Sequence, residues 1–343
     1  MVNILSSNGG RKKNLLSMIS SELLNDLVLG GHQALVKSYA DSVQYPMEDG
    51  YLLHRVAKYQ GLSKNWKDET LKEEFLGEVA RYVLGLARAN GTSVDDIDAA
   101  VAEAGELTTS NFAHRLHYPP LNNDPHDPLQ ILANLGLPIY LTTSPFTFIE
   151  LALINGGSYP RTEMCRWHSG LDSVPSVLNN NGGWSNGEPA CEHNRPDGVY
   201  QPCSHKPLVF HLYGVDEYAD SLVLTEDDYL TFLMSLAKYR GKDTGVDPIH
   251  DVVKGALESS TLLLVGFSLA SWSFRALFWG LIKPIQGKTY ERRCCLQLVP
   301  SEKEQQYLTS YLRQDAQFDQ VYWEKDVTEF IRRGLKPAGE GES

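Results

Sequence analysis

A histidine near the end of an apolar run offers the clearest acid–base chemistry in this sequence. The run Leu208–Leu212 has the composition of a strand, and His211 stands close to its end. An imidazole at the mouth of a sheet can act as a general base at neutral pH. It can also cap the strand end through hydrogen bonds, and the residue types alone favour that structural role.

Two further segments place small polar residues directly after apolar runs. Thr142, Thr143 and Ser144 follow one run, and Gly266 and Ser268 follow another. A glycine between a strand and a helix permits close backbone approach, and a nearby hydroxyl can bind a sugar or a phosphate near the helix N-terminus. A plain strand-to-helix turn explains the same Gly-x-Ser pattern equally simply.

The elements that must position these residues alternate along the chain from residue 128. We expect strands at 139–142, 208–212, 222–224, 262–267, 294–299 and 320–323, and helices at 128–134, 146–154, 226–239, 246–257, 272–282, 302–312 and 327–335. Continuous apolar strands between helices are typical of a parallel sheet covered on both faces. The predicted fold is therefore α/β, doubly wound and mostly parallel (Rossmann-like). Its strand ends 142–145, 211–214 and 266–268 should converge on one cleft.

The pattern divides the chain into parts of different character. Residues 1–127 are predicted to be mostly helical and to pack on the core, because apolar residues recur at helical spacing between Leu71 and Leu86. Ser93 or Thr92 can cap the short acidic helix that follows. Residues 128–336 form the α/β core, with a long irregular insertion at 156–206, and residues 337–343 are predicted to be a disordered tail.

Composition and charge exclude several classes of protein. The 343 residues carry 31 Lys and Arg against 43 Asp and Glu, a net charge of −12, so no overall basic field attracts nucleic acid. No apolar run is long enough to span a membrane, and the first residues lack the basic-then-apolar order of a secretory signal. Five cysteines, of which Cys294 and Cys295 are adjacent, suit reduced thiols. We therefore expect a cytoplasmic protein that binds neither membrane nor nucleic acid.

Three segments carry a resemblance to a known family. They are Leu141–Pro145, Pro207–Gly214 running into Leu222–Tyr229, and Leu263–Leu269. Over about residues 128–334 the chain resembles the sirtuin-like superfamily, and specifically the sirtuin-like NAD-consuming domains of bacterial antiphage defence proteins. The most specific match is the His-x-x-Gly strand followed by Leu-Thr-Glu-Asp-Asp-Tyr.

The resemblance implies roles for individual residues. It places His211 in the nicotinamide-ribose cleft as the catalytic residue, and Ser144 where the family has an asparagine that orients water or nicotinamide. Residues expected to bind NAD are Thr142, Thr143, Gly214, Gly266 and Ser268, together with Gly30 and Gly31 as the nearest counterpart of the family's glycine-rich loop. Replacing His211 by Ala should abolish cleavage and leave folding intact, since a polar strand-end side chain contributes little to core packing.

The resemblance leaves more than one function open. The first hypothesis is a defence-type NAD glycohydrolase that cleaves NAD to nicotinamide and ADP-ribose when a partner protein triggers it. The alternative is a catalytically degenerate module that binds NAD or ADP-ribose, or that assembles with a partner ATPase or nuclease; the serine at position 144 favours it. A protein deacylase is opposed by the absence of two Cys-x-x-Cys pairs. We expect a homo-oligomer in either case.

Thiols and imidazoles gather in the insertion. They are Cys165, His168, Cys191, His193, Cys203 and His205. Such side chains could chelate zinc and stiffen a loop that cannot bury itself. Because their spacing is irregular, scattered loop residues without a metal are the favoured interpretation.

Overall fold

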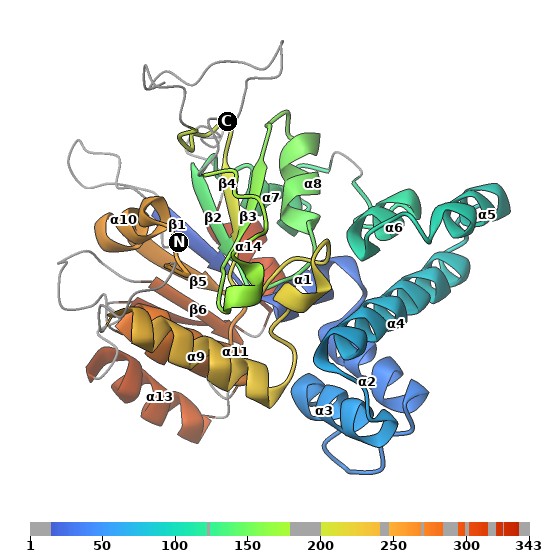
Figure 1. Ribbon diagram of the computed structural model, residues 1–343. Helices are drawn as coiled ribbons and strands as arrows, with labels where there is room; N and C mark the ends of the chain where they lie inside the picture. The colour runs from blue at the N-terminus through green and yellow to red at the C-terminus, as the bar shows by residue number, and fades with distance from the viewer. Residues whose placement is uncertain are drawn as a thin grey trace.

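The protein is built around one parallel sheet (Figure 1). The computed structural model describes residues 15–121, 124–178, 200–240, 247–268, 271–283, 294–298, 302–314, 320–324 and 326–335. The strands are β1 (Leu15–Ile19), β2 (Ile139–Thr142), β3 (Arg161–Met164), β4 (Leu208–His211), β5 (Thr261–Val265), β6 (Cys294–Leu298) and β7 (Gln320–Glu324). They lie in the order β3-β4-β2-β1-β5-β6-β7, and all neighbours are parallel. The predicted doubly wound α/β fold is confirmed.

The central strand was not predicted. β1 pairs with β2 on one side and with β5 on the other, although the sequence indicated only a mostly helical part before residue 128. The strand is a single short apolar run, LLSMI, with a buried serine in its middle. The division of the chain at residue 128 stays a prediction, but the sheet draws its central strand from before that point.

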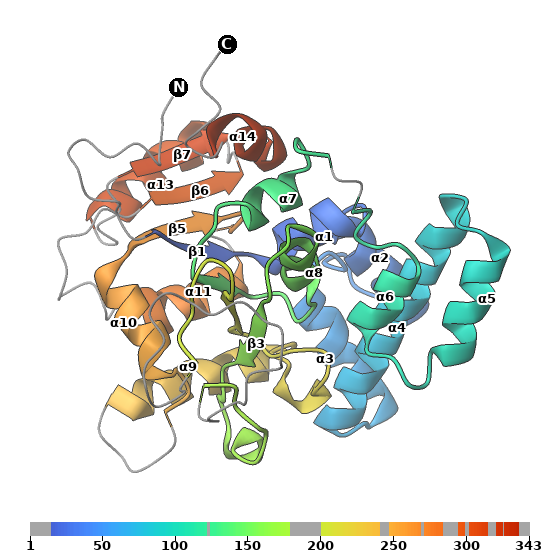
Figure 2. The ribbon, with the colours of Figure 1, turned by 90° about the horizontal axis from the view of Figure 1, so that it is seen from above.

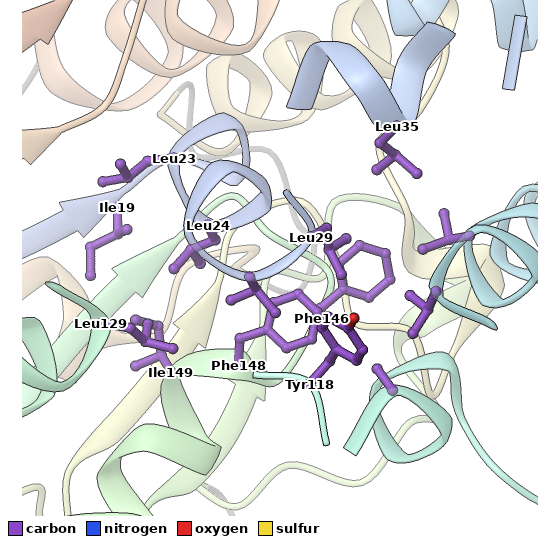
Figure 3. Close-up of a cluster of buried hydrophobic side chains, with 14 of the residues drawn as sticks. Ile19, Leu23, Leu24, Leu29, Leu35, Tyr118, Leu129, Phe146, Phe148 and Ile149 are labelled. Atoms are coloured by element: carbon purple, nitrogen blue, oxygen red, sulfur yellow. The ribbon is translucent and has the colours of Figure 1, made fainter. Parts of the chain in front are cut away.

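Successive side chains of the strands point to opposite faces of the sheet and pack into two apolar layers, one on each face. Ile19 packs on one face with helices α1 (Ser21–Val28), α7 (Pro128–Ala133), α8 (Phe148–Asn155) and α14 (Val327–Gly334). Leu16 and Met18 point to the other face, which α9 (Glu226–Arg240), α10 (Asp251–Ser259), α11 (Trp272–Leu277), the π-helical turn η3 (Phe278–Ile282) and α13 (Glu302–Gln314) cover. Figure 2 shows the helices on either side of the sheet, and Figure 3 shows Ile19, Leu24 and Ile149 packed in the first layer.

The predicted helical part lies to one side of the sheet in both views (Figures 1 and 2). It comprises α2 (His32–Ser42), α3 (Leu53–Lys64), α4 (Asp68–Ala89), α5 (Val94–Glu103) and α6 (Thr109–Arg115). Ser93 caps α5 by accepting from the Asp96 backbone N–H, one of the two caps that the sequence offered. The apolar side chains of this helical part belong to the same buried cluster as those of the first layer. No helix in the described ranges is both long and apolar enough to cross a lipid bilayer.

Two predicted elements are corrected. Residues 222–224 form no strand: the segment is buried but irregular, and the backbone N–H of Val223 donates to the carbonyl of Tyr213 as the chain turns back over the end of β4. The insertion 156–206 is not irregular throughout, because it contributes β3 to the sheet edge. The other strands and helices predicted after residue 128 are confirmed to within two residues at most ends, except that the helix predicted at 246–257 begins only at Asp251. The tail 337–343 lies outside the described residues.

Candidate functional site

The carboxyl ends of three strands meet beside the start of α1. The Thr143 backbone N–H donates to the carbonyl of Ile19 (3.1 Å), and the Thr143 Oγ1 accepts from the backbone N–H of Ser21 (2.8 Å). The Leu212 backbone N–H donates to the carbonyl of Thr142 (2.8 Å). Of the three predicted strand ends, 142–145 and 211–214 therefore lie together, and Thr143 ties them to α1; the third, 266–268, is described below.

A cavity opens beyond these strand ends. Its volume is about 50 Å³, which is room for a few water molecules and lies below the usual range of small-molecule pockets. Its lining residues are Ser21, Asn25, His32, Leu35, Leu53, Phe75, Thr143, Pro145, Phe146, Tyr213, Leu222, Val223, Leu224 and Tyr229; we call this the strand-end pocket. Of the site residues predicted from the sequence, Thr143 belongs to this lining.

The strand-end pocket is aromatic and carries no Lys, Arg, Asp or Glu in its lining. The rings of Tyr213 and Tyr229 meet edge to face with centroids 5.3 Å apart. Burial, and to a lesser extent the carboxylate of Glu22, raises the pKa of both tyrosines. With no Lys, Arg, Asp or Glu in the lining, this aromatic surface suits an uncharged group.

Asn25 and His32 form the polar end of the pocket. Asn25 Nδ2 donates to His32 Nδ1 (3.2 Å), and the Asp26 carboxylate accepts from the backbone N–H of His32 (2.6 Å). Gly30 and Gly31, both at positive φ, form the turn that leads to His32, and the N–H of Gly31 donates to the carbonyl of Asn25 (3.2 Å). These glycines therefore end α1 and position His32, while their predicted role in NAD binding stays a prediction.

His211 lies inside the core next to the pocket. Its exposure is 0 %, Nδ1 bonds the carbonyl of Ser144 (2.6 Å) and Nε2 bonds Oε1 of Glu150 (2.8 Å). The Ser144 carbonyl can only accept, so Nδ1 donates to it. With Glu150 ionised, Nε2 donates as well and the ring is an imidazolium. Burial by itself lowers the pKa of His211, but Glu150, the Ser144 carbonyl and Asp216 together raise it above its usual value.

This environment corrects the premise that His211 is a surface group with little part in folding. The side chain is fully buried, and its partner Glu150 on α8 is also buried. Glu150 Oε1 accepts a second hydrogen bond from Thr162 Oγ1 on β3 (2.8 Å). The imidazolium and carboxylate therefore link β4, α8 and the edge strand β3.

The hydroxyls of Thr142 and Ser144 are also used within the chain. Thr142 Oγ1 accepts from the backbone N–H of Ser144 (3.0 Å), and Ser144 Oγ accepts from the backbone N–H of Phe146 (3.1 Å). Both side chains are completely buried. They shape the turn between β2 and α8, and neither lines the strand-end pocket.

Two predicted glycines are crowded by the chain itself. A Cβ on Gly214 (φ +85°) would lie 2.2 Å from the carbonyl oxygen of Ser221, and a Cβ on Gly266 (φ +80°) would lie 2.4 Å from Cβ of Leu23. At Gly266 the strand order reverses between β1 and β5, where open α/β sheets usually have a ligand crevice. Here α1 occupies that position, and Ser20 Oγ donates to the Gly266 carbonyl (2.8 Å).

Ser268 lies exposed on the loop after β5, and its backbone carbonyl accepts a hydrogen bond from Oγ of Ser271 (2.9 Å). It does not belong to the lining of the strand-end pocket. Its predicted contact with a ribose or phosphate stays a prediction.

The Leu-Thr-Glu-Asp-Asp-Tyr motif has a structural role. The Asp228 carboxylate accepts from the backbone N–H groups of Leu224 (3.0 Å) and Thr225 (2.8 Å), which fixes the start of α9. Its other oxygen pairs with Lys72 Nζ (3.3 Å), and this fully buried ammonium also pairs with Asp68 (2.6 Å). The motif thus joins α9, which supplies Tyr229 to the pocket, to α4 of the helical part.

The zinc candidates do not form a site in the part of the chain that is described. His168 bonds the Asp220 carbonyl and the Gly170 N–H through its two ring nitrogens. Burial raises the pKa of the Cys165 thiol, and Cys203 is in a disulfide, which corrects the expectation that all the thiols are reduced. His205 is exposed. Among the described residues, no three or more metal-binding side chains form a group. Cys191 and His193 lie outside them.

Sequence reasoning missed most of the pocket. Tyr213 stood within the His-x-x-Gly motif and could have been found there, since it is the residue next to the glycine. Tyr229 likewise ends the acidic motif. Asn25 and His32 gave no signal, because their importance depends on β1, which the periodicity did not show.

Comparison with known families supports a sirtuin-like domain. The SIR2-like domain family matches residues 182–323, less than half of the 343 residues. Within this range lie β4, α9, β5 and β6. No curated protein matches the chain. SIR2-like domains use NAD, so the match indicates a function related to NAD.

Proposed function

We propose that this chain is a SIR2-like module that binds NAD or ADP-ribose without cleaving it. The match to SIR2-like domains supports NAD as the ligand class, and the strand-end pocket supplies a small aromatic cavity where such a sheet binds ligands. The observation that carries the proposal is the position of His211, whose two ring nitrogens are both engaged within the core.

A general base must reach the proton that it removes and have a free lone pair to accept it. The imidazolium of His211 has neither, because both N–H groups donate to Ser144 and Glu150. Ser144 is the second predicted catalytic residue, and its hydroxyl oxygen accepts a hydrogen bond from the backbone N–H of Phe146 in the turn after β2. The side chains that would activate water in a glycohydrolase therefore stabilise the fold instead.

The pocket residues are suited to binding. Tyr213 and Phe146 supply aromatic surface, and Thr143 and Asn25 supply polar groups. NAD hydrolysis, a defence role, a homo-oligomer and a partner ATPase or nuclease remain predictions from the resemblance.

The test combines calorimetry with a nicotinamide-release assay. We expect the purified protein to bind NAD or ADP-ribose and to release no nicotinamide from NAD. Replacing Leu53, which lines the pocket at the start of α3, by Trp should abolish binding, whereas the same change at the exposed Leu62 of α3 should not. Release of nicotinamide by the protein, alone or with a candidate partner added, would restore the glycohydrolase hypothesis. If the protein binds neither NAD nor ADP-ribose, the proposal is overturned.

A further inference from the structure

A long groove lies between the helical part and the loops that follow β3 and β4. Its volume is about 940 Å³, and α4 supplies one wall, over residues 69–84. The other walls are the end of α5 with the start of α6, and the segments 170–174 and 216–220. Figures 1 and 2 show α4, α5 and α6 side by side. At 1.5 Å per residue the α4 wall is about 22 Å long, or four helical turns. We call this the α4 groove.

The α4 groove has an apolar interior. Leu76 of α4, Phe112 of α6 and Leu171 line it as buried side chains, and Val101 of α5 lines it with 47 % of its surface exposed. Gly77 stands in the middle of the α4 wall and brings no side chain into the groove. Contiguous apolar surface with a polar rim is typical of protein interaction sites.

The charged side chains of the lining are acidic with one exception. Arg81 is the exception, and it pairs with Glu78, which lies outside the lining (2.6 Å). Lys72, beside Glu73 in the chain, is fully buried and pairs with two aspartates. These ion pairs of α4 do not include Glu69 and Glu73, whose side chains are exposed. The groove therefore presents negative charge around an apolar interior. Its charged lining residues are Glu69, Glu73, Arg81, Glu106, Asp216, Glu217 and Asp220.

We infer that the α4 groove docks an amphipathic helix of a partner protein, with apolar side chains facing the groove and Lys or Arg along its edges. Charge complementarity selects the basic residues, and the length of the groove accommodates about 15 helical residues. An extended peptide binds by pairing with the backbone of a sheet edge, whereas α4 and α6 use their backbone groups within the helices. The inference goes beyond the proposed function, because the α4 groove and the strand-end pocket share no lining residue.

The experiment measures binding of designed helical peptides to the full chain by fluorescence anisotropy. The probe has about 15 residues, with leucine at every third or fourth position, lysine on both sides of the leucine face and alanine elsewhere. A second probe carries phenylalanine in place of leucine. The comparison peptides are the leucine probe in scrambled order and an analogue with glutamate in place of lysine. We expect saturable binding of a probe, and binding of both comparison peptides that is at least about tenfold weaker.

Charge reversal tests the acidic rim. The double variant Glu69→Lys with Glu73→Lys should bind the probe about tenfold more weakly, since two attractive contacts become repulsive. The matched control is Glu48→Lys with Glu74→Lys, which changes the net charge equally at exposed positions outside the lining. The control should lose less than about twofold in affinity, because distant exposed charges are screened by salt.

Filling the groove tests its apolar interior. A Cβ on Gly77 would meet only the end of the Arg81 side chain, at 3.9 Å, and leucine favours a helix over glycine. Gly77→Leu should therefore melt no lower than the parent and yet bind the probe at least about tenfold more weakly. The matched control is Gly85→Leu, at an exposed position of α4 outside the lining where a Cβ meets nothing within 4 Å. It should keep both stability and full affinity.

Several results would overturn the inference. They are binding of neither probe, equal binding of the scrambled peptide, equal losses in the control variants, and full affinity in folded Gly77→Leu. Self-association of the parent chain that Gly77→Leu abolishes, measured by analytical ultracentrifugation, would also overturn it, because a second copy would then occupy the groove. If Gly77→Leu does not fold, the two charge-reversal variants decide the question. None of these results bears on NAD binding, so the proposed function stands or falls separately.

Discussion

The buried pair of His211 and Glu150 gives a quantitative test of whether His211 is structural. Replacing Glu150 by Gln keeps the shape of the side chain and removes the charge that faces the imidazolium at 2.8 Å. Removing one partner of a buried ion pair typically costs about 3–5 kcal/mol. We take the lower limit, because the glutamine oxygen can still accept from Nε2. An unfolding entropy of about 2.1 cal/mol/K per residue then predicts a fall in melting temperature of about 4 °C for the 343 residues.

The effect should depend on pH in a definite direction. Because Glu150 and its neighbours raise the pKa of His211 above its usual value despite the opposing effect of burial, the folded state binds this proton more tightly than the unfolded chain does. The stabilisation is therefore fully present below about pH 6.5, the ordinary pKa of histidine, and is lost as the pH rises through the folded pKa. The difference in melting temperature should be largest at pH 6 and should shrink toward pH 9.

Differential scanning calorimetry between pH 6 and pH 9 measures this difference. The control is Asp41→Asn on α2, where Asp41 and Lys37 form an exposed ion pair; such a pair contributes less than about 1 kcal/mol. A Glu150→Gln variant that melts within 1 °C of the parent at pH 6, or whose deficit grows with pH, would refute the imidazolium assignment. A neutral His211 could then accept a proton as a base.

Three further predictions test the packing around the site. Lys72→Met should lower the melting temperature by about 4 °C, since it leaves the buried carboxylate of Asp228 without its cation; circular dichroism measures the transition. Gly214→Ala should lower the free energy of unfolding in urea by more than about 1 kcal/mol, because its Cβ would meet the Ser221 carbonyl at a positive φ. Burial raises the pKa of Asp216, so its carboxylate destabilises the folded state as the pH rises from about 4. Asp216→Asn should therefore be more stable than the parent in urea at pH 7, with the gain disappearing near pH 4.

Much of the sheet could be predicted because its strands are continuous apolar runs bounded by helices. β2 was predicted at its observed bounds, and β5 within two residues at its end. β1 was missed because five residues with a central serine give no periodicity, and its strand character comes from pairing with β2 and β5. Residues 222–224 were apolar for a different reason, since they are buried against the end of β4 without joining the sheet.

The site was harder to predict than the fold. The sequence identified the strand ends that converge, but a motif does not show which of its side chains faces the cavity. In the His-x-x-Gly segment that side chain is Tyr213, whereas His211 faces Glu150. Similarly, position 266 must be a glycine because a Cβ there would collide with Leu23 of α1, which is far away in the sequence. Such contacts depend on tertiary packing, which one sequence does not display.

The place of β1 at the centre of the sheet has a consequence for how the protein forms on the ribosome. Its two neighbours are β2, which begins at Ile139, and β5, which ends at Val265. β1 must therefore wait for its second neighbour until Val265 has been translated. Pairing over such sequence separations is slow, and the unpaired edges are exposed to aggregation in the meantime. Synthesis with a chaperone that shields strand edges should accordingly increase the soluble yield more than lowering the expression level alone.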